Sequence, residues 1–246
     1  MEIIGLTLAS SISWFLSTLA AGGSPLILIP VIGLYLGAAA VPPVVTIGML
    51  LGNFQRMWIY WNYIDWTVMW WYLPGAIVGA GLGAFVFTQT EIQWLPVLLG
   101  IFLILSGVTC NVGNQQQLFK VNAWYFLPAG FIYAFLSGLI GSTGPMLNSL
   151  YFNYGLVKED MVATKAANVV IIHIVKVFFY ILLGAFTKAY LFYGIIIGLA
   201  AFPGNWIGQI VLEKISTERF RQIVVMFVTF SGMLMLWEQR GLFLTW

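Results

Sequence analysis

Two lysines, an asparagine and a histidine lie in one apolar stretch of this sequence, residues 161–186: Lys165, Asn168, His173 and Lys176. At 100° per residue of an α-helix they fall within an arc of about 140°, so one helix face would carry them all. Ionisable residues inside a membrane span are functional candidates by default. Two amines, an amide and an imidazole on one face predict a site for a small anion, although either lysine could instead reach the membrane interface.

His173 has a second candidate role, because histidine is the side chain whose unperturbed pKa lies near neutrality. It could carry a proton that is transported together with the anion. The alternative is a polar residue whose hydrogen bonds are satisfied within a helix bundle.

The stretch 44–63 adds Asn53 and Arg56 to the candidate ligands. The planar guanidinium of Arg56 fits sulfonate, sulfate or carboxylate oxygens, and its alternative is to reach the interface from a helix end. Asn53, Asn148 and Asn168 are expected to orient the ligand.

A glycine-proline break interrupts the apolar pattern once in each half, as AAGGSPL at residues 20–26 and GLIGSTGPM at residues 138–146. Pro25 and Pro145 suit the first turn of a helix, and the glycines before them let a ligand approach the backbone closely. A helix N-terminus carries about half a positive charge, so two of them meeting in the membrane would bind an anion. Close helix packing by small residues is the alternative. The expected ligand contacts at the breaks are Gly22, Gly23, Ser24, Ser142, Thr143 and Gly144.

The elements that position these residues are predicted to be membrane-spanning helices. Of 246 residues, 61% are hydrophobic and 7% charged, and the mean hydropathy is +0.96. Apolar stretches near the roughly 20 residues that cross a bilayer recur along the chain, which predicts an all-α polytopic membrane protein surrounded by lipid. The net charge of +2 gives no support for nucleic-acid binding. The predicted segments are 3–20, 25–41, 44–63, 66–88, 93–112, 124–141, 145–157, 161–186, 189–212 and 219–238.

Several site classes find no support in the sequence. Cys110 is the single cysteine, so neither an internal disulfide nor a cysteine metal cluster is expected, and we predict no metal and no cofactor. The eight acidic residues all fall at predicted segment ends or in loops, which leaves no carboxylate for a buried cation site or an acid-based proton relay. The first apolar stretch carries Glu2 and no basic residue before it, so it is predicted to be a retained helix rather than a signal peptide.

The chain divides into two halves with matching landmarks. Residues 1–113 and 124–246 are predicted to be two homologous transmembrane repeats of five segments each, joined by the polar linker 114–123. Thr46 and Asn53 in the first correspond to Thr164 and Asn168 in the second. Because five is odd, consecutive repeats would face opposite ways across the membrane, provided that the short second segment of each half crosses it.

Positive charge in short loops predicts the orientation. If both termini face outward, the inner loops collect most of the basic residues, and the outer ones keep only Lys188 and Arg240. The inner set is Lys120, Lys158, Lys214, Arg219 and Arg221.

These patterns resemble those of the TauE/SafE sulfite exporter family, whose members carry a glycine-rich break near the start of each half, followed by a proline-containing apolar segment. The residues that carry the resemblance are 22–30 (GGSPLILIP), 63–66 (YIDW), 136–145 (LSGLIGSTGP) and 163–168 (ATKAAN). It covers nearly the whole chain and implies transport of sulfite, sulfonates or other small organic anions. Ala20 and Ala21 stand where the first half often has glycine, and Ser142 and Thr143 interrupt the second glycine run. Such hydroxyl donors suit a different oxyanion.

Together these observations predict a secondary transporter in the cell membrane that moves a small anion by alternating access, and not an enzyme. An anion-selective channel would share the cationic site but needs a continuous water path. An intramembrane enzyme fits less well, because the sequence offers no catalytic aspartate pair and no metal ligand set.

Overall fold

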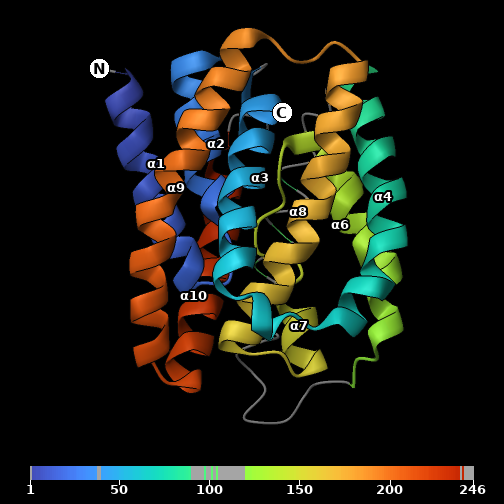
Figure 1. Cartoon of the computed structure of the whole chain (residues 1–246), viewed down its shortest axis with the longest axis vertical. Helices are drawn as coiled ribbons and strands as arrows, with labels where there is room; N and C mark the ends of the chain where they lie inside the picture. Colours follow the sequence, from blue (N-terminus) through green and yellow to red (C-terminus); the bar gives the residue numbers. More distant parts are fainter. Residues whose placement is uncertain are drawn as a thin grey trace.

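The protein is described by a computed structural model that covers residues 2–37, 40–89, 97, 101, 104, 120–238 and 240. Within that part the regular elements are helices, so the predicted all-α class is confirmed (Figure 1). The helices are α1 (Glu2–Leu19), α2 (Ser24–Leu36), α3 (Val41–Ile59), α4 (Trp66–Gln89), α6 (Phe126–Ile140), α7 (Asn148–Tyr154), α8 (Lys158–Leu182), α9 (Lys188–Lys214) and α10 (Thr217–Glu238). Short 3-10 turns at Trp61–Tyr63 and Ala123–Tyr125 precede α4 and α6.

Four helical stretches of the described chain are long and apolar enough to cross a bilayer: Trp66–Gln89, Ala123–Ile140, Lys158–Leu182 and Lys188–Lys214. Each corresponds to a predicted segment, which confirms the polytopic membrane character. The predicted segment 93–112, with Cys110, falls almost wholly outside the described residues. Most of the predicted linker 114–123 also lies there.

The two short segments differ from their predicted bounds. α2 ends at Leu36 rather than residue 41, because Gly37 adopts φ 83° and caps it, and the prolines 42–43 then begin α3. α7 has only seven residues, since 141–147 form an irregular stretch in which Gly141 and Gly144 have positive φ. At 1.5 Å per residue, α2 is about 20 Å long and α7 about 10 Å, so neither crosses a ~30 Å hydrocarbon core as a helix.

The helices pair in a pattern that repeats between the halves. α1 packs on α9 as α6 packs on α4, α3 packs on α9 as α8 packs on α4, and α3 and α8 pack on each other. In Figure 1, α1 and α3 run downward while α6 and α8 run upward, and α4 and α9 are likewise opposed. These are the directions that an inverted repeat requires, and the repeat itself stays a prediction.

Glycines let these helices approach closely. Gly75, Gly79 and Gly83 follow one another at four-residue spacing on α4, and a Cβ on any of them would lie 2.1–2.2 Å from a backbone oxygen of α6. A Cβ on Gly204 of α9 would likewise lie 2.2 Å from the backbone oxygen of Ser11 in α1. In lipid, where apolar surface gives no driving force, such small-residue contacts hold helices together.

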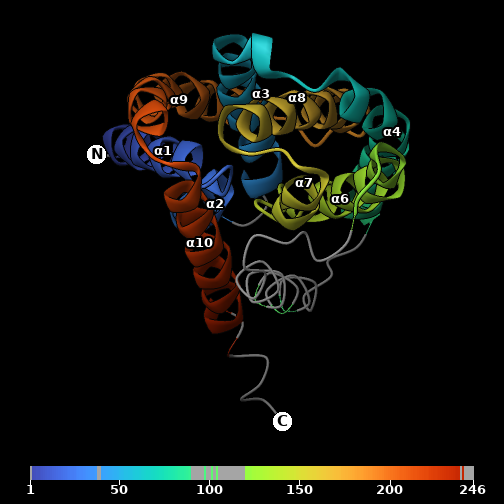
Figure 2. The same ribbon diagram turned by 90° about the horizontal axis from the view of Figure 1, so that it is seen from below.

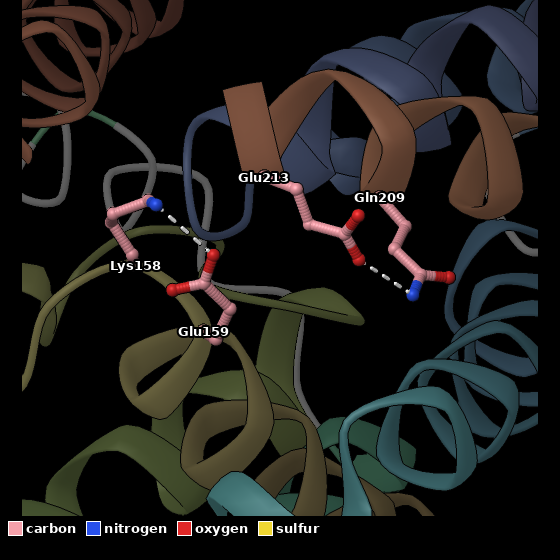
Figure 3. A network of polar contacts seen from close by, with 4 residues as sticks. All are labelled: Lys158, Glu159, Gln209 and Glu213. Atoms are coloured by element: carbon pink, nitrogen blue, oxygen red, sulfur yellow. Dashed lines mark hydrogen bonds and ion pairs between the residues drawn. The ribbon is translucent and has the colours of Figure 1, made fainter. Parts of the chain in front are cut away.

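The lower end of the bundle in Figure 1, where α8 begins and α9 ends, carries most of the charged residues in the described part of the chain. There Lys158 pairs with Glu159 at 3.2 Å, and Gln209 donates to Glu213 at 3.0 Å (Figure 3). α10 begins at this end and projects from the α1–α9 side of the bundle (Figure 2).

Candidate substrate-binding site

The structure brings the two glycine-proline breaks together in the interior. α1 passes into α2 through Ala21, Gly22 and Gly23, all of which have positive φ. A Cβ placed on Gly144 of the second break would lie 3.8 Å from Gly23 Cα. In α10, the ring of Phe227 covers Gly23 so closely that a Cβ there would be 2.0 Å from a ring carbon. The positive φ of Gly22, Gly23 and Gly144, together with the tight ring contact at Gly23, explains why glycine occupies these three positions.

Lys165 ties the two breaks to each other. Its Nζ donates to the backbone oxygen of Ala21 and to Oδ1 of Asn148, both at 2.6 Å. Asn148 in turn donates through Nδ2 to the oxygen of Ala20 at 3.2 Å. A Cβ on Gly22 would lie 2.4 Å from the lysine nitrogen, so only glycine leaves room for this contact. Lys165 and Asn148 therefore hold the carboxyl end of α1 against the start of α7.

Arg56 of α3 is the second buried cation of this region. Its Nη2 donates to Thr18 Oγ1 at 2.9 Å and to Asn205 Oδ1 at 3.0 Å, with the backbone oxygen of Trp14 at 3.4 Å. The guanidinium also lies 4.9 Å from the centre of the Trp14 ring, in cation–π geometry. Its Nε is buried and has no partner.

A small cavity lies between these two cations. Its water-accessible volume is about 10 Å³, roughly that of one water molecule. Arg56, Lys165 and Asn53 contribute to its wall, with Gly22, Gly23 and Gly144 from the breaks. Ser17, whose buried hydroxyl has no partner, also lines it. Among the described residues that line this cavity there is no carboxylate, so the charged side chains of its described wall are cationic.

The other predicted ligand contacts differ in whether their polar groups already have hydrogen-bond partners. The hydroxyls of Ser142 and Thr143 are buried without a well-aligned partner, with the Tyr133 hydroxyl as their polar neighbour. Asn168 donates to Tyr151 Oη at 2.9 Å and leaves its own Oδ1 unpartnered. Ser24 is already engaged, because its hydroxyl donates to the sulfur of Met49 at 3.3 Å.

Lys176 and His173 lie on the predicted face of α8 but do not line the cavity. Lys176 instead caps α6: its Nζ donates to the backbone oxygens of Ser137, at 2.9 Å, and of Gly141. A cation at a helix carboxyl end is favoured by the exposed carbonyls and the helix dipole. His173 is buried with its Nδ1 unpartnered.

The sequence patterns missed four residues of this region: Ser17, Thr18, Tyr133 and Asn205. The sequence does carry a signal for Asn205, since an amide within the apolar stretch 189–212 needs partners in lipid. Ser17 and Thr18 directly precede the first break, so proximity could have drawn attention to them. Tyr133, whose hydroxyl donates to Gly144 at 3.2 Å, offers no such signal.

The sequence profile of the sulfite exporter TauE/SafE family matches residues 6–235, nearly the whole chain. The chain belongs to this family. No curated protein and no solved structure matches the chain significantly. Membership of the TauE/SafE family makes the protein a membrane protein of a transporter family, and the predicted resemblance is confirmed.

Proposed function

We propose that this TauE/SafE protein is a secondary transporter that moves a small anion, such as sulfite or an organosulfonate, across the cell membrane by alternating access. The observation that carries the proposal is the cavity between the two breaks. Arg56 and Lys165 contribute two buried cations to its wall, and none of its described lining residues is a carboxylate.

The charge balance of the cavity explains why an anion would bind there. Arg56 and Lys165 donate only to carbonyl, amide and hydroxyl oxygens, which leaves their charges without an acidic partner in the described structure. Buried charges are stabilised by opposite charges and hydrogen bonds. An oxyanion supplies both, and the Nε–H of Arg56 and the hydroxyl of Ser17, which are buried without partners, are the donors that it would use.

The size of the cavity favours a carrier over a channel. A space of about 10 Å³ holds one water and no sulfite ion, so an anion enters only when the surrounding helices move apart. Because the breaks are held together by the Lys165 contacts, we place that movement at the junction of α1, α7 and α8. Proton coupling through His173 stays a prediction, and it would act from outside the cavity wall.

Binding to the purified protein tests the proposal. A thermal-shift panel of sulfite, thiosulfate, sulfoacetate, taurine and oxalate should include anions that raise the melting temperature by mass action. Arg56→Gln should weaken binding of those anions by about ten- to hundredfold, because it removes a charge-assisted hydrogen bond.

Lys176→Met is the matched control. It removes a buried cation from the same interior and takes away the Nζ donor to the backbone oxygens of Ser137 and Gly141, so it should lower the melting temperature with little effect on anion affinity. Equal loss of affinity in both variants would contradict the proposed site. In liposomes, counter-transport exchange of the anion indicates a carrier, whereas an uncoupled leak would favour the channel.

A further inference from the structure

The hydrogen bonds of Arg56 are distributed unevenly over its guanidinium. Nη2 has acceptors on two other helices, Thr18 of α1 and Asn205 of α9, while Nε has none. A guanidinium is a rigid plane, so fixing one of its nitrogens and stacking its face on Trp14 also fixes the direction of the others.

Asn205 is itself held in one orientation. Its Nδ2 donates to the backbone oxygen of Gly52 at 2.9 Å and to Oε1 of Gln55 at 3.1 Å. With both acceptors on the Nδ2 side, the amide must present Oδ1 to the guanidinium. Asn205 thus acts as an acceptor whose position is set by α3, the helix that carries Arg56.

The Thr18 hydroxyl completes the arrangement. It accepts from Arg56, and its own proton lies within reach of the Trp14 backbone oxygen at 3.0 Å and of Asn205 Oδ1 at 3.1 Å. Both Thr18 and Asn205 are buried, at 0% and 1% exposure, so water does not compete for these contacts. Neither residue lines the cavity, whereas Arg56 does.

We propose that Asn205 and Thr18 are positioning residues that hold Arg56 by Nη2 and thereby keep its Nε–H free to bind the transported anion, with the Ser17 hydroxyl as a further ligand. This inference rests on the proposed function. It extends the site to α9 and to the residues of α1 that precede the break. The packing of α9 on α1 does not depend on this contact alone, because Gly204 lies directly against the Ser11 backbone.

A double-mutant cycle separates positioning from a structural role. Sulfite is the probe, with sulfoacetate in its place if sulfite gives no thermal shift. Asn205→Ala should weaken anion binding about tenfold in the wild-type background and less than twofold in the Arg56→Lys background, which keeps the charge but lacks Nε–H. Thr18→Ser, which keeps the hydroxyl, should bind as the wild type does, and Thr18→Val should not.

Ser11→Ala is the structural control, because the Ser11 hydroxyl joins α1 to the backbone oxygen of Ala200 in α9 at 2.8 Å, away from Arg56. It should lower the melting temperature without changing affinity. If Asn205→Ala weakens binding equally in both backgrounds, or leaves it unchanged while Arg56→Lys reduces it, the positioning role is wrong and the anion site stands. If the wild-type protein binds no anion of the panel, the proposed function fails and this inference fails with it.

Discussion

At the scale of single residues, the two buried lysines of α8 make equivalent contacts, one to a helix end of the first half and one to a helix end of the second. Lys165 donates to Ala21 at the carboxyl end of α1, and Lys176 donates to Ser137 and Gly141 at the carboxyl end of α6. In both cases the lysine donates to backbone oxygens where the helix ends, and the oxygens of Ala21 and Gly141 lie beyond the last helical residue. What distinguishes Lys165 is its place in the cavity wall, where it also contacts Asn148, the first residue of α7 after the second break.

The contact between Lys165 and Asn148 gives a prediction at this scale. Asn148→Asp keeps the size of the side chain but places a carboxylate 2.6 Å from the ammonium, in the position of Asn148 Oδ1. The resulting ion pair should satisfy the lysine from within the protein, so anion affinity should fall at least about tenfold. The melting temperature should change little, because the variant also loses the Nδ2 donor to the Ala20 oxygen, which offsets the gain from the ion pair. Thermal-shift titration with sulfite measures both quantities.

Asn148→Leu is the control for that variant, because it removes the contact without adding charge. It should lower the melting temperature, since it leaves Lys165 with one partner fewer. Undiminished anion binding by Asn148→Asp would show that Lys165 is a purely structural cation.

The sequence predicted which residue types gather at the site, but not their partners. Glycine-proline breaks and intramembrane cations are visible in a linear sequence because each conflicts with a lipid environment. Arg56 and Asn205, in contrast, are 149 positions apart, and no local sequence pattern predicts their hydrogen bond. The sequence predicts Lys176 to be in the site because it shares a helix face with Lys165. Only the fold shows that the carboxyl end of α6 lies beside it.

At the scale of elements, the pairing of α4 with α6 depends on a line of glycines. A Cβ on Gly79 would lie 2.2 Å from the backbone oxygen of Phe131, a backbone atom that cannot move aside as a flexible side chain would. Gly79→Ala should therefore push the helices apart and lower the melting temperature of the purified protein by several degrees, about 1–3 kcal/mol of overpacking.

Gly33→Ala in α2 is the matched control. Its nearest neighbour would be a methyl carbon of Val41 at 3.7 Å, an ordinary van der Waals contact, so we expect no loss of stability. A Gly79→Ala protein as stable as Gly33→Ala would mean that the α4–α6 contact is looser than the structure shows.

The bounds of the long helices followed from apolar length, because a bilayer sets that length. The short elements were less predictable. α7 was expected to extend over 145–157, yet only Asn148–Tyr154 is helical, since the apolar residues 146–147 belong to the irregular backbone of the break. Hydropathy alone does not separate a helix from an irregular segment that is buried among other helices.

At the scale of the whole molecule, the fold gathers charges that are scattered in the sequence. α8 begins, α9 ends and α10 begins at the lower end of the bundle in Figure 1. Lys158, Lys214, Arg219 and Arg221 therefore lie at one end, and Lys188, at the start of α9, lies at the other. Because acidic residues contribute little to the positive-inside rule, Glu159 and Glu213 at the same end do not offset these cations.

This charge distribution predicts that the end shown in Figure 3 faces the cytoplasm and that both termini face outward. Fusions at the C-terminus test it: alkaline phosphatase should be active there, and green fluorescent protein should not fluoresce. Inserting the same reporters after Lys214, between α9 and α10, should give the opposite pair of results. If the C-terminal fusion fluoresces instead, the orientation is reversed. The proposed anion site would be unchanged by that result, because it lies where the two breaks meet inside the bundle, but its two entrances would then exchange sides of the membrane.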